Sequence, residues 1–94
     1  MSDIALVKPH SLSPEKAKAF VQTVTNGLAT KYGLESEWKG NTLHFHRSGV
    51  DGRVVVKDAD IRINLDLGFL MKPFKNEFVR QIETGFNQLP AGRR

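Results

Sequence analysis

The sequence contains no cysteine, so neither a disulfide framework nor a thiolate metal site is available to this chain. It also has no run of 18 uncharged apolar residues, and residues 1–8 lack the charged segment and long apolar run of a secretory signal. We therefore expect a cytoplasmic protein without a membrane span.

Linkers, internal repeats and low-complexity segments are absent as well. A chain of 94 residues forms one domain and buries only about 60 to 65% of its unfolded surface. We expect a single domain over residues 1–94, with disordered ends at 1–2 and 91–94. The formal net charge is +4, but Arg93 and Arg94 supply two of these charges at the very end of the chain. The charge is thus weak evidence for a polyanionic partner.

The first half of the chain predicts a strand followed by a long helix. Residues 4–7 are β-prone, and Pro9 confines the end of that strand to an edge or a terminus. Ser13, Pro14 and Glu15 then supply an N-cap hydroxyl, a proline for the first helical position and an acid near the positive end of the helix dipole. Apolar residues recur every three or four positions after them: Ala17, Phe20, Val21, Val24 and Leu28. A helix is expected over residues 14–32, with Gly33 as its left-handed C-cap.

The second half predicts an antiparallel meander and a closing helix. Alternating apolar and polar residues indicate strands at 34–39, 42–46, 53–57 and 61–67. The turns between them are expected at Gly40-Asn41, at residues 49–52 and at residues 58–60. From about Pro73 the apolar spacing becomes helical through Phe74, Phe78, Val79, Ile82, Phe86 and Leu89, and Pro90 disfavours any continuation. Gly85 is expected to weaken this helix.

The fold class predicted from these elements is α+β, with a five-stranded, mostly antiparallel sheet in the order β-α-β-β-β-β-α. Both helices are amphipathic and the sheet has one apolar face, so both helices should cover that face. The apolar face would contain Trp38, Leu43, Phe45, Val54, Val56, Ile61, Ile63, Leu65 and Leu67. We expect the first strand to be a parallel neighbour of the second through a right-handed crossover. Pairing of the first strand with the last is the alternative.

The sequence offers candidates for a metal site but no ligand motif. His44 and His46 lie on one strand face, and a third ligand would have to come from Glu35, Glu37 or Asp66. Two solvated histidines on a polar sheet face are the simpler interpretation. No nucleophile and base pattern occurs, and the Gly-x-Ser-x-Gly sequence of hydrolases is missing. We therefore predict no catalytic residues, no metal, no cofactor and no enzymatic activity.

Nucleic-acid binding is the competing function class. The polar sheet face would present Arg53, Lys57 and Arg62, as RNA-binding sheets do, but Trp38 and Phe45 fall on the core side, where they cannot stack on bases. Contacts to duplex phosphates could instead come from lysines in both halves of the chain: Lys16, Lys18, Lys72 and Lys75.

The segment from residue 67 to 74 contains more large apolar residues than a link between a strand and a helix requires. In the simpler interpretation, Phe69, Leu70 and Met71 are packed where the chain turns from sheet to helix. In the functional interpretation they form an exposed apolar lip beside Lys72 and Lys75, which would contact an apolar surface or a partner protein. We take these five residues as the candidate contact site.

Several short patterns together resemble one bacterial family, the polyhydroxyalkanoic acid system proteins. These patterns are Pro9-His10-Ser11-Leu12, Trp38-x-Gly40-x-x-Leu43-x-Phe45, Gly49-Val50-x-Gly52, and Leu67-Gly68-Phe69-Leu70 followed by Lys72-Pro73. The resemblance implies a cytoplasmic protein acting at or near polyhydroxyalkanoate storage granules, and it assigns no catalytic residues. Together with the missing catalytic patterns, it leads us to expect a non-enzymatic accessory protein. We expect the granule surface or a granule-associated protein as its partner, with a homodimer as an open alternative.

Overall fold

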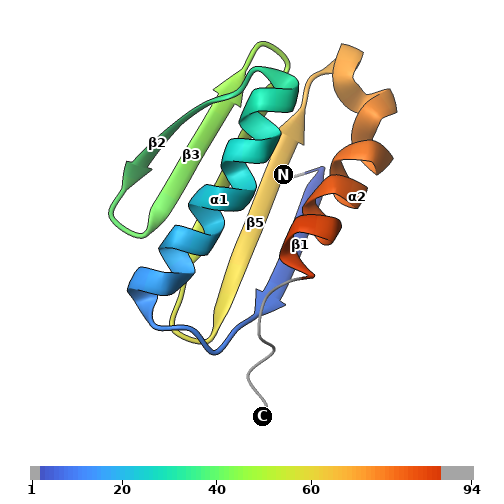
Figure 1. Cartoon of the computed structure of the whole chain (residues 1–94). Coiled ribbons are helices and arrows are strands. Elements are labelled where there is room, and N and C mark those ends of the chain that lie inside the picture. The colour runs from blue at the N-terminus through green and yellow to red at the C-terminus, as the bar shows by residue number, and fades with distance from the viewer. Residues whose placement is uncertain (1–2, 88–94) are drawn as a thin grey trace.

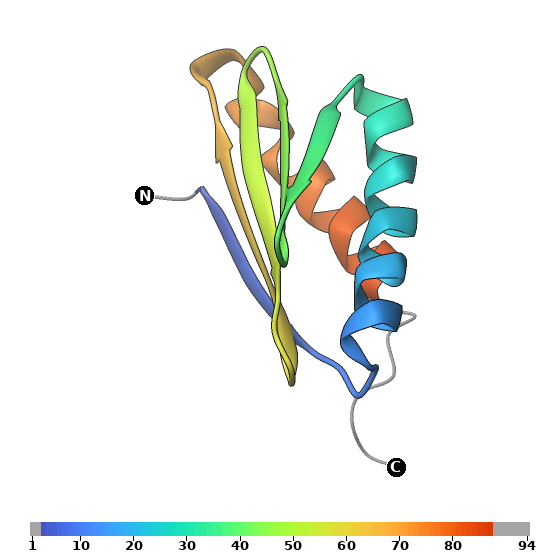
Figure 2. The same ribbon diagram turned by 90° about the vertical axis from the view of Figure 1, so that its left-hand side faces the viewer.

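The computed structural model describes residues 3–87 and has the predicted α+β architecture. Five strands form one sheet, and both helices lie on the same side of it (Figure 1, Figure 2). The elements are β1 (Ile4–Pro9), α1 (Pro14–Tyr32), β2 (Glu35–Lys39), β3 (Thr42–Arg47), β4 (Val50–Val56), β5 (Asp60–Leu67), the 3-10 segment η1 (Phe69–Phe74) and α2 (Lys75–Phe86). The disorder expected at residues 1–2 and 91–94 and the helix end expected at Leu89 fall outside the described residues.

The sheet order is β1-β5-β4-β3-β2, and every neighbouring pair is antiparallel. The expected parallel pairing of β1 with β2 is therefore wrong, and the alternative pairing with the last strand is right. β1 pairs with β5 from Ile4 opposite Leu65 to Pro9 opposite Asp60. The crossover helix α1 carries the chain from one edge of the sheet to the other (Figure 1). This order gives β5 a partner on each side, which suits a strand whose four apolar side chains are all buried.

The predicted division of the sheet into an apolar and a polar face is confirmed. The residues expected in the core are buried, except that Trp38 is half-buried because it lies on the edge strand β2. The Trp38 indole Nε1 donates to Gln22 Oε1 of α1 at 2.6 Å, which satisfies its polar atom at that edge. Neither α1 nor α2 covers the opposite face of the sheet, which holds the polar side chains of alternate positions (Figure 2).

Helix α1 begins and ends at the predicted signals. The Ser13 hydroxyl accepts from the Lys16 backbone N–H at 3.3 Å, and Gly33 closes the helix in the left-handed conformation with φ 70°. Helix α2 passes Gly85, and an added Cβ there would lie 2.7 Å from Val24 Cγ1 of α1. The glycine expected to weaken α2 is thus the position where the two helices approach closely, and Phe20 and Phe86 pack edge to face beside it at 5.5 Å.

Two boundaries in the second half differ from the prediction. The turn between β3 and β4 occupies only Ser48 and Gly49, and Gly52 lies inside β4 opposite Phe45. A Cβ on Gly52 would lie 2.7 Å from the Phe45 ring and 2.5 Å from Leu65 Cδ1, so the glycine makes room for core side chains and does not form a turn. The closing helix also begins later than expected, because a 3-10 segment precedes it at residues 69–74.

Candidate functional site

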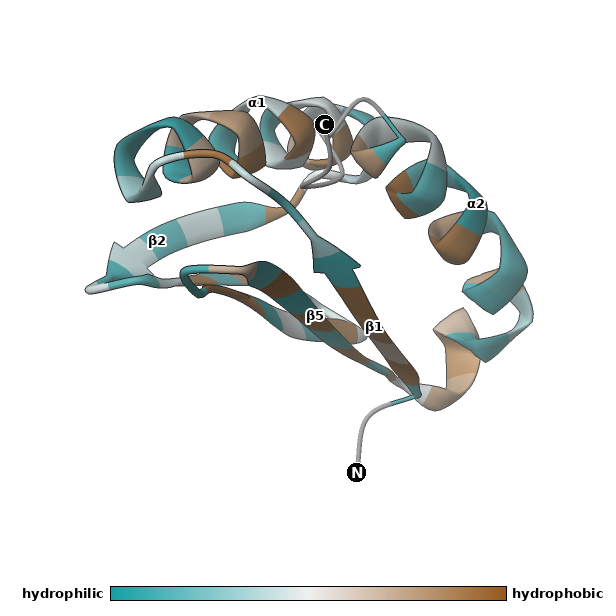
Figure 3. Cartoon of the chain, turned by 90° about the horizontal axis from the view of Figure 1, so that it is seen from below, coloured by the Kyte–Doolittle hydropathy of each residue, from teal (hydrophilic) through white to brown (hydrophobic). Residues whose placement is uncertain are grey.

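The corner between β5 and α2 exposes three large apolar side chains on one short 3-10 segment. Phe69 is 84% exposed, Leu70 is 81% exposed and Phe74 is 50% exposed. We call these three residues the apolar tip. Figure 1 places η1 at the end of the molecule where the β3–β4 turn and the C-terminus of α1 also lie, and Figure 3 shows the apolar character of this segment. Three large hydrophobic side chains are thus exposed within six residues, and such a local concentration of exposed apolar groups marks a candidate interaction surface.

Two glycines and a methionine form the base of the tip. The Gly68 N–H donates to the Gly49 carbonyl at 2.7 Å, and a Cβ on Gly68 would lie 3.2 Å from Gly49 Cα. Met71 packs over Gly49, where its Cγ would be only 2.8 Å from an added Cβ, and Gly49 itself has φ 87°. The missing side chain of Gly68 lets its backbone approach the β3–β4 turn, and the missing side chain of Gly49 leaves room for Met71.

Asp3 fastens the same corner from the N-terminal side. Its carboxylate accepts from the Leu67 N–H at 2.8 Å and from Lys72 Nζ at 2.9 Å. The hydrogen bond from Leu67 and the Lys72 ammonium lower the pKa of the Asp3 carboxyl below its ordinary value. Asp3 therefore stays ionised at neutral pH and links the start of β1 to the end of β5 and to η1.

The structure thus divides the predicted contact residues. Phe69 and Leu70 are exposed, so the simpler interpretation, in which they are packed in the corner, is wrong for these two residues. It is right for Met71, which is half-buried against the core. The Lys72 ammonium is engaged by Asp3, whereas Lys75 is exposed and forms no ion pair among residues 3–87.

Phe74 was missed as a contact residue because its spacing to Phe78 fits a helical stripe. Residues 69–74 form a 3-10 helix with three residues per turn, so Phe74 does not continue the apolar face of α2 and is exposed. Pro73, which disfavours the α conformation of the residue before it, was the sequence signal for this break.

The histidines on the open sheet face lie beside acids of the neighbouring strand. His44 lies opposite Glu37 and His46 opposite Glu35, beside a shallow hollow of about 190 Å3. Asp66 lies one strand farther away, because Asp51 stands between it and His46 in the cross-strand row. Within residues 3–87, no three His, Cys, Asp or Glu side chains gather closely enough to hold a metal ion.

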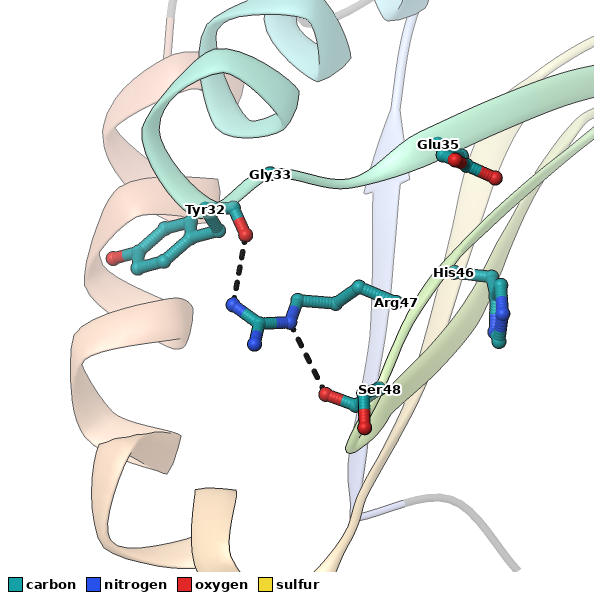
Figure 4. A pocket seen from close by; sticks show the side chains of 6 residues that line it. All are labelled: Tyr32, Gly33, Glu35, His46, Arg47 and Ser48. Carbon is teal, nitrogen blue, oxygen red and sulfur yellow. Dashed lines mark hydrogen bonds between the residues drawn. The ribbon is translucent and has the colours of Figure 1, made fainter.

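A larger hollow, of about 460 Å3, lies where α1 meets the sheet (Figure 4). Arg47 reaches across it and donates to the Tyr32 carbonyl at 2.9 Å and to the Ser48 carbonyl at 3.1 Å. These bonds satisfy a carbonyl in the last turn of α1, where a cation also complements the helix dipole. Arg47, which lines this hollow together with Glu35 and His46, therefore already has a structural role.

The lysines considered for phosphate contacts do not share a surface. Lys16 and Lys18 belong to the first turns of α1, whereas Lys72 and Lys75 lie in η1 and α2 at the opposite end of the molecule (Figure 1). Lys18 also sits over the Trp38 ring at 5.2 Å. A continuous basic stripe, the usual footprint of a nucleic-acid-binding domain, is not formed by these four residues.

Residues 4–89 match the family model described as "Putative polyhydroxyalkanoic acid system protein". The chain belongs to this family. Comparison with curated proteins and with solved structures gave no match. In the part of the chain that the structure describes, no helix is long and apolar enough to cross a membrane.

The patterns that carry the family resemblance have structural explanations in this polyhydroxyalkanoic acid system protein. His10 is buried: its Nδ1 accepts from the Leu12 N–H at 3.0 Å, so its Nε2–H donates to the Lys57 carbonyl at 2.7 Å. The imidazole thereby joins the β1–α1 connection to the β4–β5 turn. Gly52 fits beneath Phe45, and Gly68 fits against Gly49. Of the matched patterns, only the one at Phe69 and Leu70 exposes large apolar groups.

Proposed function

We propose that this protein is a non-enzymatic accessory component of the polyhydroxyalkanoate storage system that attaches to the granule surface, or to a granule-bound protein, through its apolar tip. The observation that carries the proposal is the exposure of Phe69 and Leu70, 84% and 81%, on a corner that is otherwise tightly built. Membership in the polyhydroxyalkanoic acid system family supplies the context. On this proposal the protein is cytoplasmic and is located at the granules.

The energetics of apolar burial support attachment through so small a site. Removing apolar surface from water gains roughly 25 cal/mol per Å2, so two or three large side chains supply several kcal/mol before the costs of ordering and association. The exposed ammonium of Lys75 adds orientation more than affinity, because exposed charge pairs contribute little.

The proposed absence of enzymatic activity has support in the surroundings of the candidate groups. His44 and His46 are exposed on the open sheet face, and their cross-strand neighbours Glu37 and Glu35 are exposed as well. Such solvated groups lack the burial that tunes catalytic acids and bases. Nucleic-acid binding is not favoured as a second function, because the candidate lysines lie at opposite ends of the molecule.

The proposal predicts that replacing the two most exposed tip residues separates attachment from stability. The double variant Phe69→Ser/Leu70→Ser should lose co-sedimentation with isolated granules, while its free energy of unfolding stays within about 1 kcal/mol of the parent, as for other surface substitutions. Val7→Thr is the matched control, because Val7 is 58% exposed on β1 and lies outside the tip. Granule binding by the double variant at the parent's level would refute the proposal.

A further inference from the structure

Resting on the proposed function, we infer that the occupant of the apolar tip is the uncharged aliphatic polyester surface itself. The tip inserts Phe69, Leu70 and Phe74 into the boundary of the polymer, and no granule-bound protein or anionic lipid headgroup is needed. Three features of the corner carry this inference: its area, its charge and its rigidity.

The three side chains of the apolar tip offer by themselves less area than a stable protein interface buries. Large apolar side chains present about 150 to 250 Å2 each, so three residues exposed by 84%, 81% and 50% offer on the order of 400 Å2. A stable protein complex buries about 800 Å2 on each partner. The hollow beside the tip is lined by residues 46–51 and 66–68, and the three tip side chains are not among its lining residues. A small projecting group of this kind suits insertion into an apolar phase.

The charges around the tip favour an uncharged surface. The Lys72 ammonium is neutralised by Asp3, so Lys75 is the one exposed cation of η1 and the first turn of α2 that forms no ion pair among residues 3–87. Recognition of anionic headgroups uses clusters of about four to eight lysines and arginines. An aliphatic polyester is neutral and offers apolar chain with ester carbonyls, which one cation and three apolar side chains can match.

The tip is held in its exposed arrangement before any contact is made. Asp3 bonds to both Leu67 and Lys72, and Met71 packs on Gly49 beneath the segment. A segment that is ordered in advance loses less conformational freedom on binding, which improves the affinity available from a small area.

The test compares protein-free amorphous polyester particles with native granules and with anionic phospholipid vesicles. We expect the parent protein and Val7→Thr to bind bare polyester and native granules alike. Phe69→Ser/Leu70→Ser should bind both at least about tenfold more weakly. Anionic vesicles should bind the parent at least about tenfold more weakly than polyester does. As a second measurement, Phe69→Trp in a Trp38→Phe background should show a blue-shifted emission and slower acrylamide quenching on bare polyester.

Each other outcome overturns a definite part of the inference. Tip-dependent binding to native granules without binding to bare polyester refutes the inference and leaves the proposed function with a protein partner. Binding to anionic vesicles as strong as to polyester refutes the choice of surface. Absence of tip-dependent binding to all three refutes the inference and the proposed function together. Binding of the Phe69→Trp variant to bare polyester without a change in its indole emission refutes insertion of the tip.

Discussion

At the scale of single residues, two helical glycines differ in whether the fold requires a glycine there, and the sequence alone does not show this difference. Gly27 of α1 is exposed, and an added Cβ there would meet nothing within 4 Å. Gly85 of α2 faces Val24 Cγ1 at 2.7 Å from its Cβ position. Helix propensity penalises both glycines equally. Only the arrangement of the two helices shows which one is required.

We predict that alanine stabilises the protein at Gly27 and destabilises it at Gly85. Gly27→Ala should raise the free energy of unfolding by about 0.5 to 1 kcal/mol, because it removes unfolded-state entropy at an open position. Gly85→Ala should lower it by about 1 to 2 kcal/mol, since overpacking against the stiff Val24 side chain outweighs the propensity gain. Urea denaturation followed by circular dichroism measures both values. Stabilisation by Gly85→Ala would show that the helices separate at little cost.

Tyr32 has a hydroxyl oxygen that is buried and lacks a hydrogen-bond partner among residues 3–87. Its ring packs on Phe78 with the centroids 4.5 Å apart. Burial raises the pKa of the Tyr32 hydroxyl above its ordinary value, and the Glu77 carboxylate raises it further. The sequence contains one tyrosine, so the phenol absorbance of the protein reports this residue alone.

We predict that the absorbance change of Tyr32 occurs at a higher pH in the folded protein than in urea. The folded state holds the phenol proton more tightly, so the Tyr32 contribution to stability is full below about pH 10 and is lost as the pH rises towards the folded-state pKa. Tyr32→Phe should lack this loss and should be as stable as the parent or more stable at pH 7, because it removes an unsatisfied polar group. Identical titrations in folded and unfolded protein would contradict the burial of this hydroxyl.

At the scale of the elements, the corner before η1 depends on a contact between residues far apart in the sequence. Asp3 accepts a hydrogen bond from the N–H of Leu67, which lies 64 positions later in the chain. The Asp3 carboxyl has a lowered pKa, so its contribution is present above its ordinary pKa and is lost as the pH falls through the folded-state value, in the acid range below about pH 4. The corner should therefore loosen in acid before the core unfolds.

Amide exchange at Leu67 tests this link. We expect several-fold faster hydrogen exchange at the Leu67 amide in Asp3→Ala at neutral pH, because the acceptor of that amide is removed. Asp3→Asn keeps an oxygen acceptor but loses the charge that holds Lys72, so its exchange rate should lie between those of Asp3→Ala and the parent. Exchange at core amides such as Ile63, which is 1% exposed, is the internal control and should not change. Equal Leu67 rates in all three proteins would show that Asp3 does not hold the corner.

The sequence predicted the elements well where the signal is local. Ser13, Pro14 and Gly33 fixed α1, and the alternation of β5 placed its apolar side in the core. The prediction from the sequence was wrong where the placement of a strand or residue depends on partners far away in the chain. β1 lies beside β5 because β5, whose apolar side chains are all buried, has a partner strand on each side. The role of Gly52 depends on Phe45, which lies opposite it on the adjacent strand. The exposure of Phe74 depends on the 3-10 segment, and the spacing of apolar residues in the sequence does not reveal this segment.

At the scale of the whole molecule, the two faces of the sheet have separate tasks. One face carries both helices and the packed core of the described residues (Figure 2). The other face is solvated and presents charges of both signs, such as Glu37 and Arg53 on either side of His44 in one cross-strand row. The segment η1 that carries the apolar tip lies at the end of the molecule, beyond the end of β5 (Figure 1).

The solvated setting of the open sheet face leads to the prediction that the purified protein does not turn over polyester or hydroxyacyl thioesters. The two side chains closest to a catalytic constellation, His44 and His46, are exposed and face exposed glutamates, so neither has the oriented partner that general base catalysis requires. The assay measures the release of hydroxy acid and of free thiol by the parent, His44→Ala and His46→Ala at equal concentration. All three should match the buffer blank. Turnover by the parent that disappears in either histidine variant would make the open sheet face an active site, whereas turnover retained by both variants would point to a contaminating hydrolase.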